Sequence, residues 1–345
     1  MEMEIVTRET PNVASRFSRP TATSWQQSVR HAVRDPAELW RLLNLPASLL
    51  PAAQRAAELF PLFAPREYIA RMRPGDLTDP LLRQVLPQGE ELLPVAGFTA
   101  DPVGDAAAGR GPGLLHKYRT RALLVTTGVC AIHCRYCFRR HYPYDELPRS
   151  LDEWEPALAE IAADTSLDEV ILSGGDPLMQ TDGRLSELAA RLAAIEHVTR
   201  LRIHTRLPIV IPSRVNDTLL SWLRGIRLAP IVVIHANHAA ELDAEVPAAL
   251  ARLADAGVVL LNQSVLLRGI NDNADALTEL CRRLVNLRVM PYYLHQLDRV
   301  AGAAHFEVAP ERGRQLVEDL QRRLPGYAVP RYVQEVPGAE CKTPM

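Results

Sequence analysis

The chain has 345 residues, 47% of them hydrophobic, and a formal net charge of −2. This composition is typical of a globular protein with one large core or two domains, and the small charge gives no indication of nucleic acid or an anionic membrane as a partner. No apolar run reaches the roughly 18 residues of a membrane-spanning helix. Residues 1–17 contain acids and no apolar segment, so we predict no secretion signal and expect a cytoplasmic protein.

Residues 1–115 are predicted to form short helices separated by prolines. Asp35, Pro36 and Glu38 stand in an order typical of a helix start, because Asp can cap, Pro suits the first turn and Glu can reach back. Further short helices are predicted in residues 51–60, 65–72 and 79–86. We find no chemical motif in this region and expect it to pack against, or cover, the rest of the chain.

From residue 122 onward, six β-rich runs alternate with amphipathic helices. The strands are predicted at residues 122–127, 169–173, 200–204, 230–235, 258–262 and 287–294. Because the runs are almost continuously apolar, they indicate a parallel sheet covered by helices. Six repeats favour an α/β fold with a partial (β/α)6 barrel over residues 116–330, which leaves residues 331–345 as a C-terminal strap. Polar residues follow every strand, as expected of a site at the carboxyl ends of the strands.

The clearest chemical motif is the C-x3-C-x2-C spacing of Cys130, Cys134 and Cys137. Three thiolates on one loop can hold three irons of a cubane iron–sulfur cluster and leave the fourth iron for a substrate-like ligand. Structural zinc is the alternative, since His133 or His141 can supply a fourth ligand. The other two cysteines are not predicted to bind a metal. Cys281 lies on an apolar helix stripe and is expected in the core, and Cys341 is interpreted as a passive packing residue in preference to one that adjusts the reactivity of the neighbouring lysine.

The segment CAIHCRYC, with Tyr136 before its third cysteine, resembles the signature of radical S-adenosylmethionine (SAM) enzymes. SGGDPL, which follows the second predicted strand, is similar to the glycine-rich loop that contacts SAM in that family. Alternatively, the glycines of this loop can simply allow the chain to turn after the strand. The resemblance implies a partial barrel, a [4Fe-4S] cluster on the three cysteines and bound SAM. It assigns cofactor contacts to Tyr136, Ser173, Gly174, Gly175, Asp176 and His204.

Several segments more specifically resemble the lysine 2,3-aminomutase family, among them LLHKYRTRALL, NQSVLLRGIND, MPYYLHQLD and the terminal KTP. That family adds pyridoxal 5′-phosphate (PLP) to the radical SAM cofactors. The resemblance implies that Lys342 is the catalytic lysine that bonds to PLP. It assigns contacts with the phosphate and ring of PLP to Lys117, Tyr118, Arg121 and Ser264. Alternatively, Lys117 and Arg121 can belong to an ordinary solvated basic face.

The resemblance also implies how a lysine substrate is held. Arg139 corresponds to the residue that pairs with the substrate carboxylate, and Asp298 and Glu335 correspond to the acids that bind the distal ammonium. Glu335 stands where lysine 2,3-aminomutases carry Asp, and it can alternatively be a plain surface acid. The predicted reaction converts (S)-lysine to (R)-β-lysine through a 5′-deoxyadenosyl radical.

The N-terminal motifs and the end of the chain soon after Lys342 are similar to the branch of the family whose β-lysine is attached to elongation factor P by a separate lysyl ligase. An electron donor protein is a further expected partner, whereas nucleic acid and membrane are not. Three alternatives stay open: an aminomutase for another amino acid such as glutamate, a radical SAM enzyme without PLP, and a zinc-stabilised binding protein without catalysis.

Overall fold

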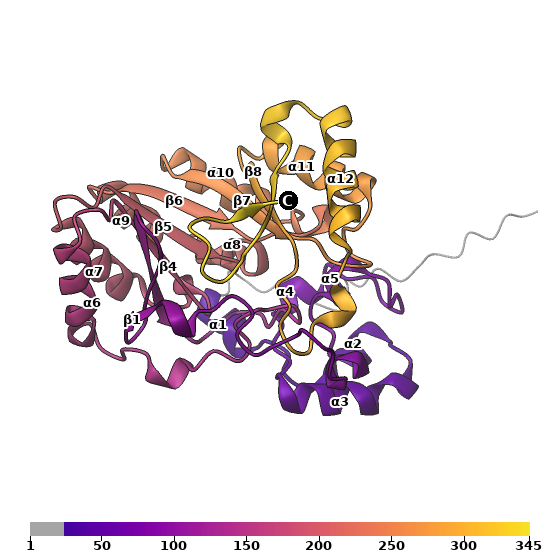
Figure 1. The fold of residues 1–345 in the computed structure, drawn as a ribbon. Helices are drawn as coiled ribbons and strands as arrows, with labels where there is room; N and C mark the ends of the chain where they lie inside the picture. Colours follow the sequence, from indigo (N-terminus) through magenta and orange to yellow (C-terminus); the bar gives the residue numbers. More distant parts are fainter. Residues whose placement is uncertain (1–23) are drawn as a thin grey trace, which may run out of the picture.

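The computed structural model describes residues 24–345, and within them ten strands form one mixed sheet whose spatial order follows the chain (Figure 1). The prediction about a secretion signal in residues 1–17 lies outside the described residues. Among the described helices, none has the length and apolar content needed to span a membrane.

Seven consecutive strands of the sheet, β3 to β9, run parallel, and antiparallel strands flank them on both sides. The strands are β1 (Gly109–Gly111), β2 (Leu114–Tyr118), β3 (Arg121–Thr127), β4 (Glu169–Gly174), β5 (Arg200–Thr205), β6 (Ala229–Ile234), β7 (Val259–Val265), β8 (Met290–His295), β9 (Arg331–Gln334) and β10 (Thr343–Pro344). The sheet is open, because β1 and β10 form its two margins. The six predicted strands are therefore confirmed as a partial barrel, and β9 adds a seventh parallel strand that the sequence did not reveal.

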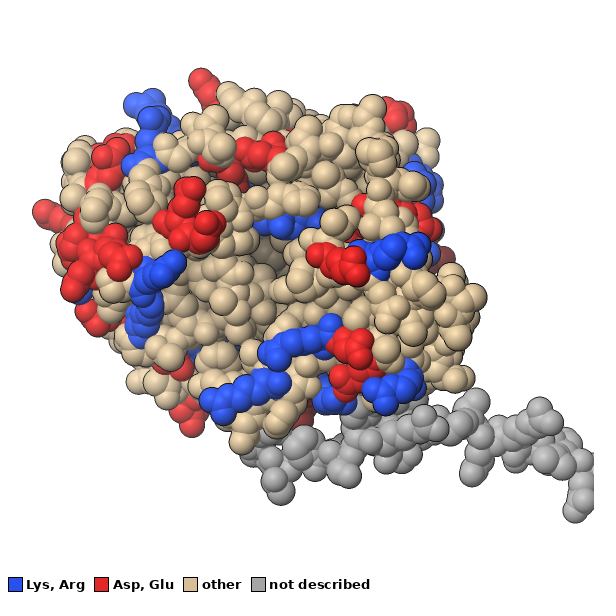
Figure 2. Space-filling model, turned by 90° about the horizontal axis from the view of Figure 1, so that it is seen from below, with Lys and Arg blue, Asp and Glu red and all other residues tan. Residues whose placement is uncertain are grey.

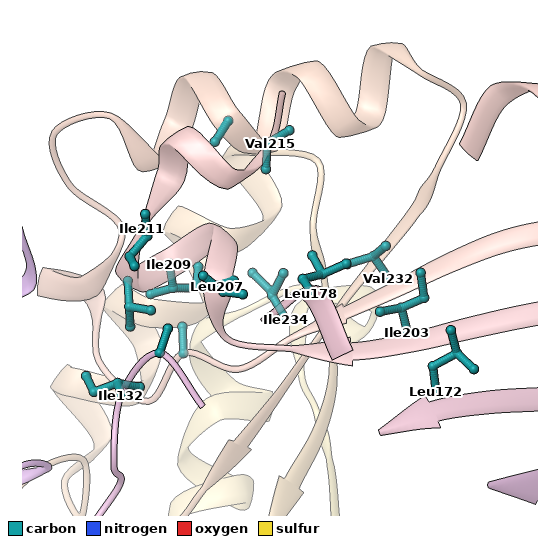
Figure 3. Packing of buried hydrophobic residues seen from close by; sticks show 14 of the residues in the cluster. Ile132, Leu172, Leu178, Ile203, Leu207, Ile209, Ile211, Val215, Val232 and Ile234 are labelled. Carbon is teal, nitrogen blue, oxygen red and sulfur yellow. The ribbon is translucent and has the colours of Figure 1, made fainter. Parts of the chain in front are cut away.

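Amphipathic helices cover the outer face of the parallel strands (Figure 1). They are α6 (Glu155–Ala163), α7 (Asp182–Ala193), α9 (Asp217–Gly225), α10 (Val246–Asp255), α11 (Ala274–Asn286) and α12 (Pro310–Arg323), with the short α8 (Leu207–Val210) after β5. The predicted apolar stripes of α7 and α11 are buried. Figure 3 shows Leu172, Ile203 and Val232, from three adjacent strands, within this apolar layer.

Five short helices precede the sheet and lie together in the lower part of Figure 1. They are α1 (Trp25–Arg30), α2 (Pro36–Leu43), α3 (Leu50–Leu59), α4 (Arg66–Ile69) and α5 (Pro80–Arg83). Asp35 caps α2 as predicted, because its carboxylate accepts the backbone N–H of Ala37 at 2.9 Å. One buried apolar cluster extends from Trp25 to Val289, so these helices share a core with the barrel. The boundary near residue 115 stays a prediction.

Candidate active site

The carboxyl ends of the parallel strands open onto a cavity of about 490 Å³. Figure 2 shows a hollow near the centre of the face seen from below, with Lys and Arg side chains at its edge. Every predicted site residue except Ser264 lines the cavity, namely Lys117, Tyr118, Arg121, Cys130, Cys134, Tyr136, Cys137, Arg139, Ser173, Gly174, Gly175, Asp176, His204, Asp298, Glu335 and Lys342. Residues far apart in the sequence are thus gathered in one space, as the hydrogen bond between Tyr118 and Glu335, 217 positions apart, illustrates.

The cysteine loop is anchored to the N-terminal helical region. The backbone N–H of His133 donates to the carbonyl of Phe63, and that of Arg135 donates to the carbonyl of Gln84, both at 2.9 Å. The side chain of Arg135 also forms a two-bond ion pair with Glu91, and both side chains are fully buried. The N-terminal region therefore does more than cover the barrel, because it fixes the loop that carries the three thiols.

Burial changes the acidity of the thiols. It raises the pKa of Cys130 well above its usual value and the pKa of Cys137 to about 11, and neighbouring cysteines add to both shifts. Thiols that face one another in a buried space ionise when a metal takes up their charge. The donor set therefore fits three thiolate ligands of an iron–sulfur cluster.

A single zinc ion fits less well. Of the two candidate fourth ligands, His133 bonds through Nδ1 to the carbonyl of Pro61 at 2.8 Å and stacks on Phe60. The exposed His141 lies 3.3 Å from the carbonyl of Ala301.

A buried arginine that the sequence analysis did not select lies beside the cysteine loop. Arg206 Nη1 is 2.6 Å from Cys134 Sγ and 2.9 Å from the hydroxyl of Tyr136, while its Nη2 pairs with Glu241 at 2.6 Å. The hydroxyl of Tyr136 also accepts a hydrogen bond from Asn237 at 2.6 Å. A guanidinium in this position stabilises negative charge on the cysteine sulfur.

The glycine-rich loop packs directly against the segment that leaves β3. A Cβ atom on Gly174 would lie 2.5 Å from the carbonyl oxygen of Thr127, and one on Gly175 would lie 2.5 Å from that of Val129. Gly174 also has a φ of 126°, which favours glycine. Glycine is therefore required here so that the SAM-type loop and the cysteine loop can approach each other.

Asp176 organises loops rather than presenting a free carboxylate. Its two oxygens accept hydrogen bonds from the hydroxyl of Thr205 and the backbone N–H groups of Leu178, Arg206 and Leu207, at 2.7 to 3.1 Å. Burial raises the pKa of Asp176, and these four donors oppose that shift. Although Asp176 lines the cavity, its predicted contact with a cofactor therefore has no support from its side chain.

Three histidines with buried Nε2 atoms line the cavity wall, and only His204 was predicted. Burial lowers the pKa of His204, of His295 and of His235, the last to about 3, so all three imidazoles are neutral. No residue among those described bonds to the Nε2 atom of any of them. Unpaired buried nitrogens that face a cavity are suited to the polar groups of a bound cofactor.

Ser264 is the one predicted site residue that the structure does not bring to the cavity. Its hydroxyl donates to the carbonyl of Ala236 and accepts from the side chain of Asn262, both at 2.9 Å. Successive side chains of a strand point to opposite faces, and in β7 it is Gln263 and Val265 that line the cavity. Ser264 is therefore turned away from the cavity that Gln263 lines, and its role as a PLP ligand stays a prediction.

Lys342 immediately precedes β10 and reaches the cavity from the C-terminal end of the chain, far in the sequence from the loop that carries Cys130, Cys134 and Cys137. Its Nζ donates to Glu335 Oε2 at 2.6 Å and lies 5.8 Å from the ring centre of Tyr293. Lys342 and Lys117 are the only lysines in the sequence, and both line this cavity. Nearby, the guanidinium of Arg121 lies over the ring of Tyr118 at 4.2 Å. An amine, a phenol and two further cations are thus available for an aldehyde that carries a phosphate.

The charged groups predicted to bind the substrate also line the cavity. Arg139 is 7% exposed and donates to Asp105 at 2.7 Å and to Ser173 at 3.0 Å. Burial raises the pKa of Asp298 to about 7, with Glu335 adding to the shift and Lys342 opposing it. Burial also tends to raise the pKa of Glu335, but its bonds to Lys342 and Tyr118 outweigh burial and lower it. Glu335 is therefore not the plain surface acid of the alternative interpretation.

Comparison with known proteins identifies the class to which this arrangement belongs. The family model of the radical SAM superfamily matches residues 124–281. The chain is 48% identical to the L-lysine 2,3-aminomutase of Escherichia coli K12, over 95% of this chain and 96% of that protein. The corresponding enzyme of Haemophilus influenzae is 43% identical over 93% and 95% of the two chains, and that of Buchnera aphidicola is 42% identical over 92% and 94%. The chain belongs to the L-lysine 2,3-aminomutase family.

Membership of this family implies a [4Fe-4S] cluster, SAM and PLP. The residues of the cavity fit all three groups. Three half-buried cysteines suit the cluster, unpaired imidazole nitrogens suit polar groups of SAM, and Lys342 with nearby cations suits PLP.

Proposed function

We propose that this protein is a lysine 2,3-aminomutase that converts (S)-lysine to (R)-β-lysine. One observation carries the proposal: a single cavity is lined by three cysteines, the only two lysines of the chain, one arginine suited to a carboxylate and two acids suited to an ammonium group. When bound, SAM at the cluster supplies the 5′-deoxyadenosyl radical, and PLP carries the migrating nitrogen. The protein positions these cofactors around the substrate and limits the access of water.

The side chains of the cavity have distinct tasks in this proposal. Cys130, Cys134 and Cys137 hold the cluster, and Lys342 binds PLP. Arg121, Lys117 and Tyr118 are proposed contacts of PLP, and Tyr136, Ser173 with the two glycines after it, and His204 are proposed contacts of SAM. Their common exposure to the cavity supports these roles.

Charge selects the substrate. Arg139 is proposed to bind the carboxylate of lysine, which a guanidinium can hold through two parallel hydrogen bonds. Asp298 and Glu335 are proposed to bind the distal ammonium. Glutamate would bring a second carboxylate to these two acids, and the repulsion would disfavour it. The charges of the cavity therefore favour lysine over glutamate.

The wider setting is also part of the proposal. The β-lysine product is proposed to supply the lysyl ligase that modifies elongation factor P, and an electron donor protein is proposed to reduce the cluster in the cytoplasm. Neither nucleic acid nor membrane is a proposed partner.

Anaerobic turnover tests the proposed function. Reconstituted protein is incubated with SAM and dithionite together with either (S)-lysine or (S)-glutamate, and the products are resolved by chiral chromatography. (R)-β-lysine from lysine, and no β-glutamate, is the expected result. Assays of iron, sulfide, zinc and PLP on the same sample test the alternative of a zinc-stabilised binding protein. Zinc without iron and PLP, or turnover of glutamate alone, would reject the proposal.

A further inference from the structure

Asp105 joins two cations of the cavity. Its side chain is almost fully buried, with Oδ1 2.7 Å from Lys117 Nζ and Oδ2 2.7 Å from Arg139 Nε. Asp105 comes from the N-terminal region, in which the sequence indicated no chemistry, and it lines the same cavity. Burial tends to raise the pKa of Asp105, but the two cations outweigh burial and lower it, so the carboxylate is ionised.

The backbone holds Asp105 in this position. Asp101 accepts the backbone N–H of Asp105 at 2.9 Å and that of Ala106 at 3.0 Å. Gly104, which precedes Asp105, has a φ of 67° and packs against Pro337 of the segment that leads to Lys342. The carboxylate is therefore fixed between the start of the sheet and the C-terminal segment.

The two cations keep only part of their hydrogen-bonding capacity. Lys117 also donates to the carbonyl of Val103 at 2.8 Å, which leaves one of its three N–H groups. Arg139 uses Nε for Asp105 and Nη1 for Ser173, so three of its five N–H groups are left. Glu335 also lies 3.8 Å from Lys117, but its other oxygen pairs with Lys342 at 2.6 Å. These three cations and two carboxylates together carry a net charge of +1.

We propose that Asp105 is a specificity-determining residue: it is the built-in counter-ion shared by Lys117 and Arg139, and it leaves this end of the cavity with a net charge of +1, which a single incoming carboxylate neutralises. Without Asp105, the buried Arg139 would lose its carboxylate partner and Lys117 would keep only the more distant Glu335, at 3.8 Å, so an external anion would be favoured. A tetrahedral dianion such as sulfate would fill that need. Asp105 thus disfavours a dianion at Arg139 and keeps that guanidinium available for a carboxylate. Assigning the incoming carboxylate to lysine rests on the proposed function, whereas the counter-ion role does not.

The first test uses sulfate as the probe and needs no substrate. PLP-loaded, cluster-reconstituted wild type, Asp105→Ala and Asp105→Glu are melted in sulfate and in chloride of equal ionic strength. An anion that binds only the folded variant raises its melting temperature. At an anion concentration about ten times its Kd, the increase is about 2–4 °C. Sulfate is expected to stabilise Asp105→Ala by at least this amount relative to chloride, and to have little effect on wild type and Asp105→Glu.

Asp255→Ala is the matched control, because it also removes one carboxylate from an arginine, Arg288, but at the exposed surface. It should respond to sulfate as wild type does. If Asp105→Ala folds poorly, the same comparison is made on its refolding yield, which sulfate should raise above that in chloride. Equal sulfate effects in wild type, Asp255→Ala and Asp105→Ala would overturn the counter-ion role.

The second test links the counter-ion to the substrate. Lysine binding to the PLP-loaded protein is measured by calorimetry without SAM, so that no turnover occurs. Sulfate should weaken lysine binding to Asp105→Ala at least about fivefold, because it competes for Arg139, and should change wild type less than about twofold. Equal weakening in both would overturn the specificity role. If wild type binds no lysine, the proposed function fails, while the melting experiment still decides the counter-ion role.

Discussion

Lys342 and Glu335 form a close ion pair, with 2.6 Å between Nζ and Oε2, inside the cavity that also contains the cysteine loop. The other oxygen of Glu335 accepts the hydroxyl of Tyr118 at 2.6 Å. One carboxylate therefore holds the proposed PLP lysine and is also a proposed partner of the substrate ammonium. The extra methylene of Glu relative to Asp contributes to the reach that lets this residue contact both Tyr118 and Lys342.

Glu335→Gln should weaken lysine binding about 10- to 100-fold, because a hydrogen bond to a charged group contributes about 1.5–3 kcal/mol. Calorimetry on the PLP-loaded protein without SAM measures this effect. Glu340→Gln is the matched control, since Glu340 is an exposed acid of the same segment. Equal lysine affinity in the two variants would show that Glu335 does not bind the ammonium.

PLP should be attached to Lys342 and not to Lys117. Because the chain has only these two lysines, borohydride reduction followed by peptide mass spectrometry gives an unambiguous assignment. Lys342→Ala should lose the PLP absorbance but keep the brown colour of the cluster, whereas Cys134→Ala should lose the cluster and the cleavage of SAM. A phosphopyridoxyl group on Lys117 would contradict the assignment.

Lysine binding should strengthen as the pH rises through neutrality. Burial is the main reason that the pKa of Asp298 is about 7, so its carboxyl group is mostly neutral near pH 6 and mostly ionised near pH 8. Only the ionised form pairs with an ammonium. Calorimetric titrations at about pH 6, 7 and 8 should show this trend in wild type and much less of it in Asp298→Asn. The same trend in both proteins would exclude Asp298 as its source.

Glu91→Gln should destabilise the protein and loosen the cysteine loop. The substitution leaves Arg135 and Arg140 without their shared buried carboxylate, and breaking a buried ion pair costs about 3–5 kcal/mol. Denaturant unfolding and the iron content per chain measure the two effects. In contrast, Glu187→Gln removes an exposed ion pair with Arg191 and should cost less than about 1 kcal/mol. Equal stability losses in these two variants would contradict the anchoring role of Glu91.

Local patterns in the sequence were sufficient to predict most of the barrel. Continuous apolar runs identified the six strands β3 to β8, and the stripes of α7 and α11 identified the buried faces of those helices. The short β9, which begins at Arg331, carries little of this signal and is defined by its pairing with β8. Pairing across the sheet is tertiary information that a local pattern does not contain.

The site was predictable where a motif or the resemblance fixed a residue, as for the three cysteines and Lys342. Ser264 stays a prediction, but it lies one position from Gln263, the neighbouring residue of β7 that lines the cavity, because successive side chains of a strand point to opposite faces. Asp105 and Arg206 have no local signal, because their significance comes from partners far away in the sequence, such as Arg139 and Cys134. The charge and burial of such residues become informative only when the fold is known.

The central claim is that the cysteine loop and Lys342 serve one reaction in one cavity. The most direct test gives the reconstituted enzyme SAM, dithionite and (S)-lysine that carries deuterium on its β-carbon, and measures deuterium in the recovered SAM and 5′-deoxyadenosine by mass spectrometry. If the radical made at the cluster removes hydrogen from the substrate held near Lys342, deuterium will appear at the 5′-carbon. Formation of β-lysine with no deuterium in either nucleoside would contradict the claim.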